Sequence, residues 1–344
     1  MEAVPLPLAQ PPLQERSTRP SRSVYPIPAR QIPEHQISDS RIRAFPVFDA
    51  PGPLALWHLA SLDAPTVAVV WSLAFAWTAG ISLPHWVPLL LALATWSVYI
   101  GDRLLDVRAG LRSPALRTLR ERHYFHWRFR RILLPLALAA ASAAAILIFT
   151  FMPAVARERN SVLAAAALAY FCGVHGMNGP ARPAFPLQLP QRTKEFLVGL
   201  LFTTGCVLPV WSRVHVSSNS SSLLWNLWIP AAYFAALAFL NCLSIARWES
   251  AEVPRIRPRS AEHDPRFTIS RQAHYLYAVV LAIAGLLLAL FAPATQARPA
   301  ALLTAGAASA LLLALLDSAR NRLTPCALRS AADLVLLTPL ILLL

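Results

Sequence analysis

Two aspartates four residues apart are the first candidates for chemistry in this sequence. Asp102 and Asp106 follow an apolar stretch and precede an arginine-rich segment. If one helix continues through both, their carboxylates lie a turn apart on one face, where like charges repel. Magnesium would remove that repulsion, because it is typically held by one or two carboxylates and completes its shell with water and phosphate oxygens. We predict a magnesium site here; the alternative is a solvated helix end, with water joining these acids to arginines such as Arg103.

A second polar group repeats this layout later in the chain. Asn241 lies inside an apolar stretch, and Glu249 follows eight residues later, next to another arginine-rich segment. An amide in a membrane helix often hydrogen-bonds a neighbouring helix, so Asn241 is either such a residue or a ligand. Arg103 and Lys194 are candidate donors to phosphate oxygens, or else charges that only set the membrane topology.

The composition indicates an all-α, polytopic membrane protein. Of 344 residues, 56% are hydrophobic and only 14% are charged, which is too apolar for a soluble chain of this length. The net charge of +14 does not indicate a nucleic-acid partner, because the basic residues fall between apolar stretches and no soluble recognition module accompanies them. The four cysteines are far apart, without metal-binding spacing, so we expect neither disulfides nor cysteine ligands.

The apolar stretches predict about nine transmembrane helices. Residues 1–53 carry eleven of the thirty prolines and scattered arginines, and are predicted to form a disordered cytoplasmic tail. Residues 54–344 form the predicted membrane domain. Its expected helices are Pro65–Leu83, Trp86–Leu105, Ile132–Met152, Asn160–Met177, Glu195–Trp211, Leu223–Ala246, Ala273–Phe291, Ala300–Leu316 and Ala331–Leu344.

The basic residues predict the orientation of these helices. If the helices alternate in direction, 27 of the 31 lysines and arginines fall on one side of the membrane. Basic residues are enriched in cytoplasmic loops, so this side, with the N-terminus and Asp102 and Asp106, is predicted to be cytoplasmic. We expect an integral protein of the bacterial inner membrane with its C-terminus outside.

These residues resemble the UbiA superfamily of intramembrane prenyltransferases, over roughly residues 60–344. That family carries N-D-x-x-D-x-x-x-D motifs at the cytosolic ends of its second and sixth helices. The first motif falls on Val98, Tyr99, Asp102 and Asp106, and keeps its two later aspartates. The second falls on Asn241, Cys242, Ile245 and Glu249, and keeps its opening asparagine and a terminal acid. The segment RTKEFLVGLLFTTG, which contains Lys194, is similar to the start of the family's fifth helix.

The resemblance implies nine helices around a central cavity and a magnesium-dependent transfer of an isoprenoid chain from a prenyl diphosphate to an unidentified acceptor. Asp102 and Asp106 would hold the magnesium, Arg103 and Lys194 the diphosphate, and Asn241 and Glu249 would form the second motif. The alternative is a non-catalytic protein of the same fold that binds a polyisoprenoid or a quinone-like lipid. The third possibility, a transporter, would need broken helices or an inverted repeat, and the sequence shows neither.

The histidines between the second and third predicted helices have two interpretations. His123 and His126 lie three residues apart in a basic, amphipathic stretch. We predict a helix at the membrane surface in preference to a metal or heme site. Trp96 and Tyr99 are interpreted either as interfacial aromatic residues or as rings that stabilise a carbocation.

Overall fold

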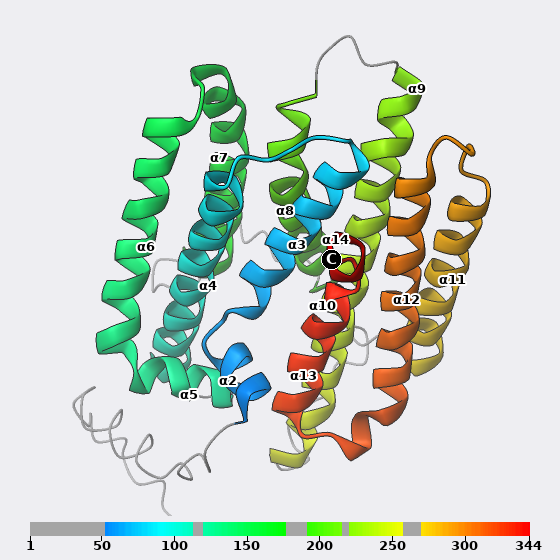
Figure 1. The fold of residues 1–344 in the computed structure, drawn as a ribbon. Coiled ribbons are helices and arrows are strands. Elements are labelled where there is room, and N and C mark those ends of the chain that lie inside the picture. Colours follow the sequence, from blue (N-terminus) through cyan, green and yellow to red (C-terminus); the bar gives the residue numbers. More distant parts are fainter. Residues whose placement is uncertain (1–51, 113–119, 177–190, 215–219, 257–269) are drawn as a thin grey trace, which may run out of the picture. The chain divides into compact units, whose positions relative to one another are not determined.

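A computed structural model of the chain describes residues 52–112, 120–176, 191–214, 220–256 and 270–344. These residues form helices and short connections, with no strand among them (Figure 1). Apart from its last two residues, the predicted tail lies outside the described residues. The helices are α2 (Pro53–Leu59), α3 (Asp63–Thr78), α4 (Trp86–Arg112), α5 (Glu121–Arg128), α6 (Arg130–Phe151), α7 (Ala154–Gly176), α8 (Gln191–Trp211), α9 (Ser220–Leu223), a π-helical turn (Leu224–Trp228), α10 (Ile229–Ile256), α11 (Arg271–Leu290), α12 (Ala297–Ala319), a 3₁₀ turn (Arg320–Arg322), α13 (Pro325–Leu334), a second 3₁₀ turn (Val335–Leu337) and α14 (Leu340–Leu343).

Seven helical segments in the described part of the chain are long and apolar enough to cross a membrane. They are Trp86–Leu111, Arg130–Phe151, Thr193–Trp211, Leu224–Glu249, Arg271–Leu290, Ala297–Arg322 and Pro325–Leu343. The all-helical class is therefore confirmed, and the seven apolar helices indicate a membrane protein.

The predicted number of nine spans is not confirmed, although a helix occupies each of the nine predicted places. The first, α3, has only 16 residues, fewer than the roughly 20 that a bilayer core requires. It qualifies only together with α2, from which it is bent by 90°, and this pair would make an eighth span. The fourth, α7, does not qualify either, and it carries the charged residues Arg157, Glu158 and Arg159 in its first turns.

The end of the helical unit that carries α2 and α5 also holds the end of α10 and the start of α13 (Figure 1). Ion pairs join three of these elements directly, because Glu249 of α10 contacts Arg120 and Arg122 at the start of α5 and Arg329 of α13. The two polar groups found in the sequence, at Asp102 and at Glu249, therefore lie at the same end of the helical unit.

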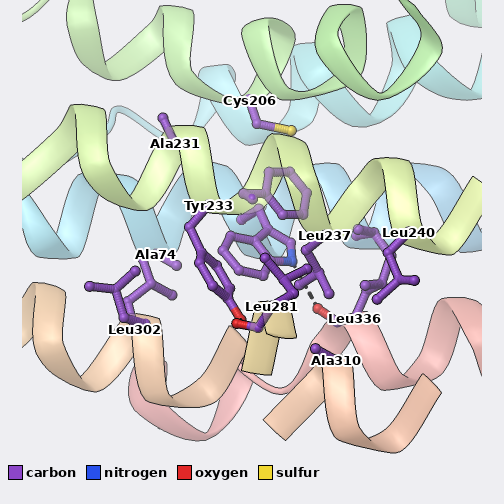
Figure 2. Close-up of a cluster of buried hydrophobic side chains, with 14 of the residues drawn as sticks. Ala74, Cys206, Ala231, Tyr233, Leu237, Leu240, Leu281, Leu302, Ala310 and Leu336 are labelled. Carbon is purple, nitrogen blue, oxygen red and sulfur yellow. Dashed lines mark hydrogen bonds between the residues drawn. The ribbon is translucent and has the colours of Figure 1, made fainter. Parts of the chain in front are cut away.

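The hydrophobic core lies where α3, α8, α10, α11, α12 and the C-terminal segment meet (Figure 2). The Trp71 ring of α3 stacks on Phe234 of α10 with centroids 3.9 Å apart, and its Nε1 donates to the carbonyl oxygen of Leu336 at 2.8 Å. This arrangement satisfies the indole's only donor while burying its ring. The core thus ties the first long helix to the end of the chain.

Small residues let the helices around Tyr233 approach closely. Tyr233 of α10 donates its hydroxyl to the carbonyl oxygen of Leu281 at 3.0 Å (Figure 2). A Cβ added at Gly285 of α11 would lie 2.7 Å from the Tyr233 Oη, and one at Gly306 of α12 would lie 2.6 Å from its Cε1. Only glycine fits at these two contacts, as is typical of close helix pairs in membranes.

The central cavity implied by the family resemblance is not confirmed. A pocket of about 210 Å³ lies beside Ala79, Arg213 and Asn226. These residues belong to the end of the helical unit opposite to α2 and α5, where α3 ends and α10 begins. This pocket is therefore remote from Asp102 and Glu249.

Candidate functional site

The two aspartates of α4 lie as their spacing predicts. The helix runs on to Arg112, because no proline interrupts the sequence after Asp102. Asp102 Oδ2 lies 3.5 Å from Arg103 Nη1, and Asp106 Oδ2 lies 3.9 Å from His123 Nε2. Both carboxylates are partly exposed, so they can reach a hydrated ion. Their oxygens, one turn apart, are of the type that magnesium prefers.

The helix α5 packs across the end of α4, α6 and α2, and its two histidines are buried against them. The prediction that this segment is a surface helix therefore misses the burial of His123 and His126. His123 Nδ1 accepts a hydrogen bond from the backbone N–H of Arg120 at 3.1 Å, so Nε2 carries the ring proton and is directed toward Asp106. Burial, followed by repulsion from Arg122, lowers the pKa of His123 far below 6.5, so this ring is neutral at physiological pH.

Glu249 is the centre of a group of arginines. Its carboxylate lies 3.1 Å from Arg120 Nη2 and 3.1 Å from Arg122 Nη2, and it also pairs with Arg329 of α13. From the sequence alone, Glu249 was interpreted as an acid of the second motif. In the structure it is instead the counterion of these arginines. The sequence interpretation does not include Arg120, Arg122 or Arg329. The signal that could have indicated this group was Arg329, a charged residue inside the apolar segment Pro325–Leu343.

Asn241 lies elsewhere on α10. Its Nδ2 donates to Asp333 Oδ1 of α13 at 3.0 Å, which is the interhelical hydrogen bond named above as one of its two possible roles. The eight residues between Asn241 and Glu249 correspond to about 12 Å of helix. The second motif is thus divided between two different sets of partners.

Lys194 lies half-buried in α8, and no ion pair of its ammonium group occurs within the described residues. Its neighbour Glu195 is more deeply buried and interacts electrostatically with Tyr170 and Cys242. The spacing of apolar residues gave no indication of Glu195.

Four arginines form one electrostatic unit, which we call the arginine cluster: Arg103, Arg120, Arg122 and Arg329. Burial, followed by repulsion from Arg103 and Arg120, lowers the pKa of Arg122 well below its usual range, and Asp102 and Asp106 oppose this shift. Arg122 Nε is buried and has no acceptor among the described atoms. The cluster therefore offers a buried donor close to the acids of α4.

This arrangement can bind an anion with several oxygens next to a divalent cation. Arginine donates two parallel hydrogen bonds to phosphate-like groups, and the α4 carboxylates can hold magnesium. Glu249 cannot act as a free metal ligand while the arginines hold it. The chain matches no family model, no curated protein and no solved structure.

Proposed function

We propose that this chain is a UbiA-like membrane prenyltransferase, which moves an isoprenoid chain from a prenyl diphosphate to an acceptor. The observation that carries the proposal is the convergence of arginines from α5 and α13 on Glu249, with Arg103 and Arg122 linking this group to Asp102 and Asp106. A prenyl diphosphate has its charge at one end and an apolar chain at the other. Its binding requires cationic donors at the end of an apolar helical unit, and this is where the arginine cluster lies.

Each polar group would have a distinct task. Asp102 and Asp106 would hold magnesium, which as a Lewis acid weakens the bond between the allylic carbon and the diphosphate oxygen. Arg122 would donate a hydrogen bond from Nε to a diphosphate oxygen, and Arg103 would neutralise charge on the leaving group. Tyr99, whose ring lies 5.7 Å from the Arg103 guanidinium, would face the allylic carbon. Trp96 is fixed by a hydrogen bond from its Nε1 to the carbonyl oxygen of Ala60 at 2.9 Å.

A non-catalytic, lipid-binding protein of the same fold is the second candidate. The observation that favours it is the state of the second motif. Three arginines hold Glu249, which lies about 12 Å along α10 from Asn241, and the Asn241 amide donates to Asp333, so the two motif residues do not meet at one second cation. Such a protein would bind a polyisoprenoid or quinone-like lipid without breaking a bond.

Release of diphosphate distinguishes the two. Full-length protein in detergent is incubated with prenyl diphosphates of several chain lengths, with magnesium or with a chelator, and the diphosphate released is measured. We expect magnesium-dependent release that Asp102→Asn lowers by roughly 100-fold or more, since losing even an outer-shell partner of a metal costs 10- to 100-fold. Glu158→Gln, at an exposed site near the start of α7, is the matched control.

The outcomes separate the candidates. Unchanged release in Asp102→Asn would refute the catalytic role of the α4 acids. Saturable binding of a prenyl diphosphate without release in the wild-type protein would favour the lipid-binding alternative.

A further inference from the structure

A second set of potential metal ligands lies apart from Asp102 and Asp106. His58 of α2, Asp63 of α3 and Asp333 of α13 each offer one ligand atom, and these atoms all lie within 4.8 Å of one another. His58 Nδ1 is 2.6 Å from Asp63 Oδ2 and 4.0 Å from Asp333 Oδ2. We call these three residues the His-Asp-Asp cluster.

The bend between α2 and α3 creates this cluster. The two helices meet at 90°, and Ser61 at the bend adopts the left-handed conformation with φ of 55°. This bend places His58, near the end of α2, against Asp63, the first residue of α3. The helix α13 packs on both α2 and α3 and adds Asp333. A left-handed serine is unfavourable, so the packing around it must hold this bend in place.

The charges of the cluster require a cation or a shared proton. His58 and Asp63 are buried, and two carboxylates this close cannot both remain ionised without a cation or a proton to share. The hydrogen bond from His58 to Asp63 compensates one of the two acids. Asp333, whose Oδ1 receives only the neutral amide of Asn241, is left to share either a proton with Asp63 or a bound cation.

Asn241 gives an independent indication of a ligand. This residue is 6% exposed, and its amide end faces the cluster, because Nδ2 donates to Asp333. Its Oδ1, on the same carbon atom, is buried and has no hydrogen-bond partner within the described part of the chain. Buried acceptors without a donor are uncommon in native proteins, and a metal ion or its water would satisfy this one.

We propose that the His-Asp-Asp cluster binds one divalent transition-metal ion, with Asn241 Oδ1 as a further ligand or as an acceptor for a metal-bound water. One imidazole and two carboxylates suit zinc or manganese better than magnesium or calcium, which prefer oxygen ligands alone. Metal–ligand bonds of about 2.0–2.2 Å in tetrahedral geometry hold ligand atoms roughly 3.3–3.6 Å apart. His58 Nδ1 and Asp63 Oδ2, at 2.6 Å, must therefore move apart, and Asp333 Oδ2, at 4.0 Å from His58 Nδ1, must move closer. His58 Nδ1 must also give up its proton to the solvent.

The ion would link three separate elements. It would join α2, α3 and α13, which lie beside the arginine cluster, and would hold the left-handed bend at Ser61. The proposal does not depend on prenyl transfer, since neither the α4 acids nor the arginines supply a ligand. Diphosphate release, which depends on Asp102, would report separately on the proposed function.

Metal content and thermal unfolding of the full-length protein in detergent test this site. We expect about one zinc ion per chain after purification without chelators. Removal of the ion should lower Tm, and zinc should restore it. In His58→Gln and Asp333→Asn the affinity for zinc should fall by more than about 100-fold, since they remove direct ligands. His274→Gln replaces another buried histidine, hydrogen-bonded to Ser244, and should bind zinc like the wild-type protein.

Zinc X-ray absorption of the wild-type protein gives a measurement that does not depend on the folding of any variant. A first shell of nitrogen and oxygen supports the site. A shell containing sulfur would place the zinc at a cysteine and overturn the proposal. Stripped wild-type protein whose Tm does not respond to zinc or manganese would also overturn it, since the two carboxylates would then share a proton instead.

Discussion

Replacing Glu249 with glutamine tests whether this residue is a counterion or a metal ligand. The change keeps the volume of the side chain and removes the charge that Arg120, Arg122 and Arg329 share. If Glu249 is a counterion, its loss leaves buried guanidinium groups uncompensated and destabilises the fold. If Glu249 belongs to an acidic metal site, then with the metal removed by a chelator the substitution relieves repulsion between carboxylates and stabilises the fold. The sign of the change therefore decides between the two.

The exposure of the groups sets the magnitude. Removing one partner of a buried ion pair costs about 3–5 kcal/mol. The Glu249 side chain is 20% exposed, so water recovers part of that loss, whereas Arg122 and Arg329 are only 13% and 7% exposed. We expect Glu249→Gln to lower the free energy of unfolding by about 2–4 kcal/mol in the absence of anions.

Unfolding in mild detergent with a chelator measures this difference. Inorganic diphosphate should raise the Tm of Glu249→Gln more than that of the wild-type protein, because the anion occupies the position of the lost carboxylate. Glu158→Gln, exposed on α7, is the control and should change stability by less than about 0.5 kcal/mol. An unchanged or increased stability of Glu249→Gln would refute the counterion role.

Two further predictions concern packing and pH. Gly285→Ala should lower the free energy of unfolding by about 1–3 kcal/mol, because the added Cβ would clash with Tyr233. The control Gly205→Ala, whose Cβ would meet open space, should be neutral or stabilising. Equal unfolding midpoints for the two variants would contradict the close packing. His126 donates through Nδ1 to the carbonyl oxygen of Arg122, its Nε2 accepts from the Ser61 hydroxyl, and burial lowers its pKa to about 4. Because His126 takes up a proton near pH 6.5 in the unfolded chain but only near pH 4 in the folded protein, the free energy of unfolding should fall as pH falls from 6.5 toward 4, by about 2 kcal/mol at pH 5. Unfolding measured at pH 7.5 and pH 5 tests this, and His126→Gln should lack this part of the pH dependence.

The sequence by itself determined the helices and the position of the α4 acids. Long apolar stretches can satisfy their backbone in a membrane only as helices or closed barrels, and stretches of this length fit helices. A helix places residues four apart on one face, so the relation of Asp102 to Asp106 follows from local geometry. Both properties depend on short segments of chain and on the solvent around them.

The tertiary structure decided the partners of each polar group. Glu249 meets arginines from α5, more than a hundred residues earlier, and from α13, and His58 meets Asp333 near the other end of the chain. Such pairs depend on which helix faces pack together, and the spacing of residues within one helix does not encode that choice. The length of α3 was decided in the same way, because the bend at Ser61 fixes where that helix begins and its packing fixes the direction in which it runs.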